Sequence, residues 1–147
     1  MAHPTSALAV QYLRRIALQL ERMGVSVDDW YALSGVDPQA VQSEDFVLDL
    51  ETFHSLSVDA MRLSDEPALG LMVGERLGAE AHGALGYAAM SSKSMREVLG
   101  LIERYLRLRI ALITLSVEES DTEVRLVFTE LVPLGAIRTL VLEGVVC

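Results

Sequence analysis

Residues 81–92, AHGALGYAAMSS, bring together the residue types of this chain that could do chemistry. They include a histidine, a tyrosine, two glycines three positions apart and a pair of serines. Such a segment suits three kinds of site: a phosphate-binding loop, a catalytic turn, or the wall of a ligand pocket. The first two need specific neighbouring residues, so the flanking sequence decides among the three.

The phosphate-binding interpretation fails on the residues around the glycines. A dinucleotide fingerprint needs Gly-x-Gly-x-x-Gly directly after a strand, and a P-loop ends in Gly-Lys-Ser or Gly-Lys-Thr. Gly83 and Gly86 instead follow a predicted helix and an acidic loop, and no lysine stands at the required place. The small residues indicate a buried, closely packed helical or extended element that ends at Ser91 and Ser92.

Neither a catalytic site nor a metal site is predicted. His82 and Ser91 do not form a Gly-x-Ser-x-Gly elbow, and the other two histidines, His3 and His54, stand at the N-terminus and inside a predicted helix. The acids near His54 fit a solvated helix side better than a set of metal ligands. Because Cys147 is the single cysteine, no disulfide can form within the chain. We expect no enzyme and no cofactor.

Composition limits the class of partner. The 147 residues are half apolar and 22% charged, which is typical of one globular domain. The net charge of −9 disfavours binding to nucleic acid and to anionic membranes. No apolar run reaches the roughly 18 residues of a membrane helix, and the N-terminus lacks a signal-peptide pattern. We therefore expect a cytoplasmic protein.

Helical periodicity runs through most of the first 109 residues. Helices are predicted over residues 6–23, 26–35, from 37 onward, 49–63, 65–78 and 94–109. The clearest start signals are Asp37 before Pro38, and Ser94 with Glu97. Residues 26–41 have the spacing of half a helix-turn-helix unit, but they are acidic where a DNA-reading helix carries bases. Plain packing of short helices is the better interpretation, with Trp30 and Tyr31 fastened to the core.

From residue 110 the pattern alternates between apolar and polar residues, with a turn at Ser120 and Asp121. This pattern predicts an antiparallel β-hairpin. Helical periodicity returns at Pro133, and the chain stops at Cys147 inside an apolar helical face. The predicted fold is α+β: a mostly helical N-terminal half, then a hairpin packed on the helix at 94–109 and the helix from Pro133, and no jelly-roll. We expect one effector domain over residues 1–147, truncated at its C-terminal end.

Arg104, Arg107 and Arg109 form a basic cluster at the end of a predicted helix. One interpretation is structural, since cations are favourable at a helix C-terminus and Glu103 can pair with them. The other is an anchor for a ligand carboxylate, which a guanidinium binds through two hydrogen bonds. Arg109 stands out because helical spacing places it on the same face as Tyr105.

Three segments resemble a known family: EPALGLMVGERLG, HGALGYAAMSSKSMREVLGLIERYLRL and, after the hairpin, PLGAIRTLVLE. They are similar to the N-terminal effector domain of AraC-type transcription regulators, in the arabinose-binding-like group that includes regulators of ornithine utilisation. The resemblance covers about residues 12–143. It implies a bacterial, cytoplasmic sensor whose small-molecule effector, such as an amino acid, controls a C-terminal domain with two helix-turn-helix units. DNA would be contacted only by that domain, which this chain lacks.

Two functions remain open: a ligand-sensing regulatory domain, or a dimerisation module that takes no ligand. A homodimer is expected in either case. For a ligand, we expect a cavity between residues 81–92, the helix at 94–109 and the inner side of the hairpin. The predicted lining is apolar at Tyr87, Met90, Tyr105 and Ile113, and polar at His82 and Arg109. Residues 81–92 are thus interpreted as the wall of a pocket.

Overall fold

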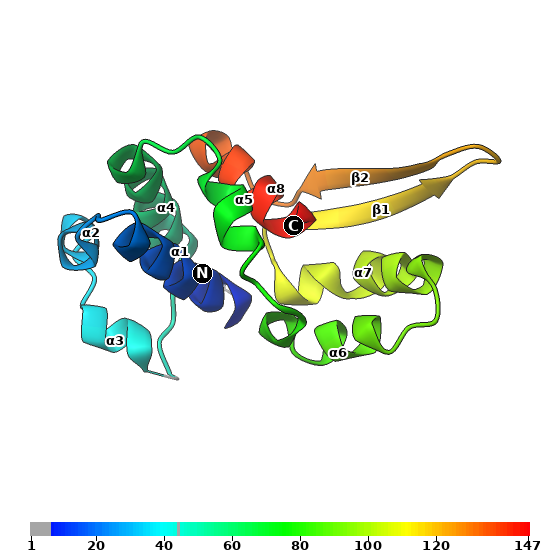
Figure 1. The fold of residues 1–147 in the computed structure, drawn as a ribbon, viewed down its shortest axis with the longest axis horizontal. Coiled ribbons are helices and arrows are strands. Elements are labelled where there is room, and N and C mark those ends of the chain that lie inside the picture. The colour runs from blue at the N-terminus through cyan, green and yellow to red at the C-terminus, as the bar shows by residue number, and fades with distance from the viewer. Residues whose placement is uncertain (1–6, 44) are drawn as a thin grey trace. The chain divides into compact units, whose positions relative to one another are not determined.

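The computed structural model describes residues 7–43 and 45–147, and its fold is α+β as predicted (Figure 1). Its strands form one two-stranded antiparallel sheet, which is a hairpin and no jelly-roll. The chain divides into two compact units: residues up to Leu77 together with Gly135–Cys147, and Gly78–Leu134. The single effector domain expected for the whole chain remains a prediction. Among the described residues, no helix combines the length and apolar character needed to cross a bilayer.

The first unit is entirely helical. Its elements are α1 (Ala7–Arg22), α2 (Val27–Leu33), α3 (Pro38–Gln42), α4 (Leu50–Ser64), α5 (Leu69–Gly74), the 3₁₀ turn η2 (Gly135–Ile137) and α8 (Arg138–Val146). Ser6, where the first helix was predicted to begin, lies outside the described residues. The predicted caps are confirmed, because Ser26 accepts the backbone N–H of Asp29 and Asp37 accepts that of Gln39. Side-chain acceptors of this kind satisfy N–H groups that the first helical turn leaves unpaired.

Trp30 and Tyr31 hold α2 in the core of the first unit, as predicted. Both side chains are buried, and their rings lie 4.7 Å apart between centroids. The Trp30 indole N–H donates to the carbonyl oxygen of Leu56 in α4 at 2.8 Å, which satisfies the polar end of a buried ring. The helix-turn-helix-like run therefore packs its aromatic residues inward against α4.

Helix α8 packs against α5, and a place for it beside the hairpin stays a prediction. Glycines make this contact possible. A Cβ built on Gly70 would lie 2.6 Å from the carbonyl oxygen of Leu140, and one on Gly74 would lie 3.0 Å from the Cα of Gly144. The hydroxyl of Tyr12 in α1 donates to the same Leu140 oxygen at 2.7 Å, in a buried bond that spans 128 positions of sequence.

The helix predicted for residues 65–78 is wrong at its start. Asp65 adopts a left-handed conformation, with φ of 49°, and ends α4, while α5 begins only at Leu69. Asp tolerates this region better than most non-glycine residues, because its short polar side chain can bond locally. Asp65, two positions before Pro67, had indicated the start of a helix, whereas here it forms the sharp turn between α4 and α5.

The second unit consists of η1 (Ala79–His82), α6 (Ala84–Met90), α7 (Met95–Arg109), β1 (Ile113–Glu119) and β2 (Val124–Glu130). Ser94 caps α7 by accepting the N–H of Glu97, and Ser120 closes the hairpin turn with Glu123. The strands pair in a register that places Leu115 opposite Phe128. Within this unit, the hairpin lies on one side of α7 and α6 on the other (Figure 1).

The exposed edge of the hairpin is held by α7. Glu103 accepts the backbone N–H of Val117 at 2.8 Å, and Arg96 forms an ion pair with Glu119 at 3.0 Å. The Val117 N–H has no strand partner on that side, because an edge strand leaves alternate backbone groups unpaired. One acidic side chain on α7 thus blocks part of the edge.

Residues 81–92 were expected to be helical or extended and buried; they are helical over Ala84–Met90, but most of α6 is not buried. Only Gly86 is buried in α6. Its Cα lies so close to the carbonyl of Ala79 that a Cβ would collide with it. Tyr87 and Met90 are 62% and 72% exposed. Small residues correctly indicated a close backbone contact, but that contact involves one face of α6 only.

Candidate functional site

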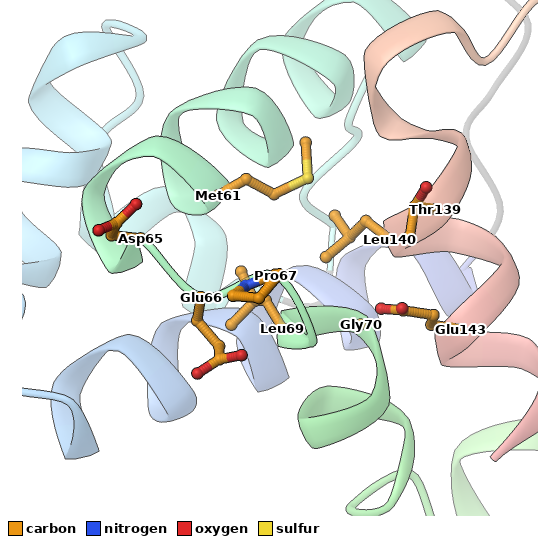
Figure 2. A pocket seen from close by; sticks show the side chains of 9 residues that line it. All are labelled: Met61, Asp65, Glu66, Pro67, Leu69, Gly70, Thr139, Leu140 and Glu143. Atoms are coloured by element: carbon orange, nitrogen blue, oxygen red, sulfur yellow. The ribbon is translucent and has the colours of Figure 1, made fainter.

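A pocket of about 380 Å³ opens in the first unit between the end of α4, the start of α5 and α8. Its volume lies in the range of small-molecule sites. The residues that line it are Met61, Asp65, Glu66, Pro67, Leu69, Gly70, Thr139, Leu140 and Glu143 (Figure 2). All of them belong to the same compact unit.

The turn between α4 and α5 forms one end of the pocket. The left-handed Asp65 ends α4 and is exposed at the rim. Glu66 folds back, and its carboxylate accepts the backbone N–H of Ala68 at 2.9 Å. Pro67 follows at the pocket wall. The turn therefore carries two acidic residues in succession, Asp65 and Glu66, followed by the apolar ring of Pro67.

Glu143 reaches the pocket from α8, and its carboxylate points toward Gly70 (Figure 2). A Cβ built on Gly70 would lie 2.7 Å from the Glu143 Oε2 atom. Only glycine at position 70 therefore lets the carboxylate lie flat on α5. In the described part of the chain, this buried Oε2 atom has no hydrogen-bond partner. A buried acceptor without a hydrogen-bond partner is energetically costly.

The negative charge of Glu143 also acts on Tyr12. The pKa of the Tyr12 hydroxyl is raised well above its ordinary value. Burial is the main cause, and the charge of Glu143 is the second. The hydroxyl therefore stays protonated and donates to Leu140 in the neighbouring wall. This bond fixes α8 against α1 and holds the face of α8 that carries Glu143.

Met61, Leu69 and Leu140 supply most of the apolar wall. In Figure 2 the side chains of Met61 and Leu140 approach one another across the opening, with Glu143 beside them. The polar residues of its lining are Asp65, Glu66, Thr139 and Glu143. Its chemistry is that of a binding pocket with apolar walls and carboxylates.

The six residues predicted to bind a ligand all lie in the second unit, and none lines this pocket. His82 ends η1, Tyr87 and Met90 are on α6, Tyr105 and Arg109 are on α7, and Ile113 begins β1. Tyr87, Met90 and Tyr105 are exposed, whereas Ile113 is fully buried. Arg104 lies over the ring of Tyr105 at 5.9 Å.

The structure does bring His82 and Arg109 together. Arg109 donates from Nη2 to the carbonyl oxygen of Ala81 at 3.2 Å, and its guanidinium lies over Gly83. Burial, and next the charge of Arg109, lower the pKa of His82, while Glu80 opposes the shift. The buried Arg109 Nε atom has no partner within residues 7–43 and 45–147. Arg109 is thus partly bound to backbone, while its buried Nε–H has no acceptor among the described residues.

Sequence reasoning missed the pocket because its polar residues looked ordinary. Glu143 is the single acid of α8, whose sequence RTLVLEGVV is otherwise mostly apolar. Gly70 and Gly74 stand four apart in α5, a spacing that permits close approach of a second helix. An acid on one apolar helix and paired glycines on another are the signals that could have indicated the contact.

Residues 24–147 match the family described as "Arabinose-binding domain of AraC transcription regulator, N-term". The chain is also similar to the "Ornithine utilization regulator" of Pseudomonas aeruginosa, with 32% identity over 135 residues. That alignment covers 92% of this chain and 40% of the regulator, so the chain spans less than half the length of that relative. The family match includes the three segments whose motifs indicated a resemblance.

Proposed function

The chain belongs to the family of N-terminal arabinose-binding domains of AraC transcription regulators, and from that membership we propose that it senses a small metabolite. Binding would regulate a DNA-binding domain in the remaining part of a full-length, cytoplasmic regulator. A family of transcription regulators points to a role without catalysis. The net charge of −9 supports the view that DNA is contacted elsewhere, because phosphates repel an acidic surface.

The pocket between α4, α5 and α8 is the observation that carries this proposal. Its volume of about 380 Å³ suits a small metabolite, and it combines apolar side chains with a few polar groups. Two of its walls, α5 and α8, are far apart in sequence and pack directly on one another at Gly70 and Gly74. A ligand between them would change the packing of the C-terminal helix, which is a direct route from binding to a structural response.

A melting experiment tests the proposal. The 147-residue chain is heated with L-ornithine, other amino acids, arabinose, other sugars and short fatty acids, each at millimolar concentration. A ligand that binds the native state stabilises it by mass action, by about 2.7 kcal/mol at a free ligand concentration of 100 times Kd. The melting temperature rises as a result. Ornithine and arabinose are included because the relative and the family carry their names. If no compound shifts the melting temperature, the sensing function is refuted.

We also propose that Arg109 and His82, with Tyr87, Met90, Tyr105 and Ile113, contribute a carboxylate-binding site in the second unit. The closeness of Arg109 to His82, whose pKa its charge lowers, supports this proposal. Arg109→Ala should then weaken binding of a carboxylate metabolite at least tenfold, since a charged hydrogen bond contributes about 1.5–3 kcal/mol. Arg107→Ala, at an exposed position on the same helix, is the matched control.

The alternative function is a dimerisation module without a ligand. It is favoured by large exposed apolar side chains in the second unit, namely Tyr87, Met90, Met95, Leu108, Val124 and Leu126. Surfaces of this kind commonly mark protein contacts. Sedimentation equilibrium of the chain distinguishes the two functions when combined with the melting experiment. Tight dimers and an unchanged melting temperature with every metabolite would favour the module.

A further inference from the structure

We propose that the outer edge of β2 is a homodimer interface, at which β2 of one chain pairs antiparallel with β2 of a second copy to form a four-stranded sheet. The inference goes beyond the sensing function, because no ligand enters it. It names the surface, the partner and the register through which two copies associate.

Strand β2 has one side without a ladder partner, because the sheet of the described residues has two strands. Leu131 donates its backbone N–H to Leu112 across the hairpin. In an antiparallel pair, the backbone groups of successive residues point alternately toward the partner strand and away from it. The N–H and C=O groups of Val124, Leu126 and Phe128 therefore point away from β1.

The outer edges of the two strands differ in how they are protected. On β1, the outward N–H of Val117 is bound by Glu103 of α7. The sequence of β2, VRLVFTE, contains no proline and no lysine, which are the residues that commonly prevent pairing at a sheet edge. An edge of this kind is a template for another strand, and such pairing is a common mode of recognition.

Helix α7 covers the β1 half of one face of the hairpin and leaves the β2 half open. The helix packs against β1 (Figure 1), where Ile113 and Leu115 are buried. On the same face of β2, Val124 and Leu126 are 51% and 43% exposed. A strand added beside β2 would continue the sheet and cover this apolar surface, which favours its association.

The sequence of β2 is complementary to itself. A two-fold antiparallel pair centred on Leu126 places this leucine opposite its own copy, and Val124 opposite Phe128. An aromatic residue opposite a β-branched one stabilises a sheet. On the other face Arg125 lies opposite Val127, so no like charges meet. A register shifted by two residues would place the two copies of Arg125 opposite one another, which is unfavourable.

The two ends of the second unit carry opposite charges. Residues 118–125, at the tip of the hairpin, contain four acids and one base, and Arg96 near the start of α7 forms an ion pair with Glu119 there. The other end of α7 carries a basic cluster of Arg104, Arg107 and Arg109. Antiparallel pairing brings each acidic tip level with the basic end of the second copy, whereas parallel pairing would bring the two acidic tips together. Charge complementarity therefore favours a second copy in the antiparallel orientation.

Sedimentation equilibrium of the 147-residue chain measures the Kd of the dimer. Leu126→Lys places two ammonium groups opposite one another at the centre of the pair, so Kd should rise by about tenfold or more, as for other central interface residues. Leu33→Lys is the matched control. Leu33 is an exposed leucine at the end of α2, and its replacement changes the net charge equally, so Kd should stay the same.

Hydrogen exchange tests the pairing at the level of single backbone groups. The outward amides of Leu126 and Phe128 should be protected at protein concentrations above Kd and should exchange rapidly below it. The amide of Val127, which faces β1, should be protected at both concentrations. A dimer held by side chains alone would not produce this alternation along β2.

Three outcomes overturn the inference: a monomer at every concentration, an equal rise of Kd in Leu126→Lys and Leu33→Lys, or equally fast exchange of the Leu126 and Phe128 amides above and below Kd. If Leu126→Lys fails to fold, the exchange of the unaltered chain decides. None of these results bears on the sensing function, which the melting experiment with metabolites tests separately.

Discussion

The bond between Tyr12 and Leu140 gives the sharpest test of how α8 is held. Tyr12→Phe removes one hydroxyl and keeps the ring, which is buried 6.3 Å from the ring of Phe53. The lost hydrogen bond is 2.7 Å long and buried. A bond of this kind contributes about 0.5–1.5 kcal/mol. We therefore expect a loss of about 1 kcal/mol in the free energy of unfolding.

Urea denaturation followed by tryptophan fluorescence measures this change. Trp30 is the single tryptophan of the chain and lies buried in the same unit as Tyr12. For a chain of this size, the expected loss corresponds to a melting temperature lower by about 3–6 °C. Tyr87→Phe is the control, because that side chain is 62% exposed and should change stability by less than about 0.5 kcal/mol.

A loss below about 0.3 kcal/mol for Tyr12→Phe would be no larger than the usual uncertainty of such comparisons. It would contradict the packing of α8 on α1. An equal loss in Tyr87→Phe would also refute the reasoning, because it would show a general effect of removing a hydroxyl.

Three further predictions concern the second unit. Gly86→Ala should lower the free energy of unfolding by about 1–3 kcal/mol, because the new Cβ collides with the carbonyl of Ala79; its failure to do so would show that α6 and η1 are further apart. Gly100→Ala should raise stability by about 0.5–1 kcal/mol, because nothing lies within 4 Å of a Cβ there and glycine weakens a helix interior. Chemical denaturation by urea, followed by circular dichroism, checks both signs. The pKa of His82 is lowered in the folded state, so the unfolded state binds a proton at this histidine more readily. The free energy of unfolding is therefore highest above the ordinary pKa of histidine, and it falls as the pH drops through the folded-state pKa of His82. His82→Gln should therefore lose less stability than the wild type between about pH 7.5 and 5.5, and equal losses would contradict the burial of this ring.

Local signals predicted most of the helices and the hairpin. The caps at Ser26, Asp37 and Ser94 depend on residues two or three positions apart, so their effect is visible in sequence. The turn at Ser120 is equally local. The error at Asp65 arose because one residue type serves both as a helix cap and as a left-handed turn residue. The choice between the two depends on tertiary contacts of the helices that it connects.

The pocket could not be predicted from sequence because its walls meet only in three dimensions. Gly70 matters through its contact with Glu143, 73 positions later, and no local pattern records that pairing. The predicted site relied instead on aromatic and basic residues close together in sequence. That reasoning grouped His82 with Arg109, whose charge acts on His82 in the structure, but it could not show that Tyr87 and Met90 face outward.

The packing of α8 on α5 also has a consequence for how the chain folds. About 60 residues separate these helices, so bringing them together carries a loop-closure entropy of about 3–4 kcal/mol. The second unit is continuous in sequence and needs no such closure. We expect its hairpin and α7 to form early, during synthesis as well as on refolding, while the first unit waits for its last segment. Contacts with such wide sequence separation slow folding. The native fluorescence of Trp30 in the first unit should therefore appear later than hydrogen-exchange protection of the hairpin in the second unit.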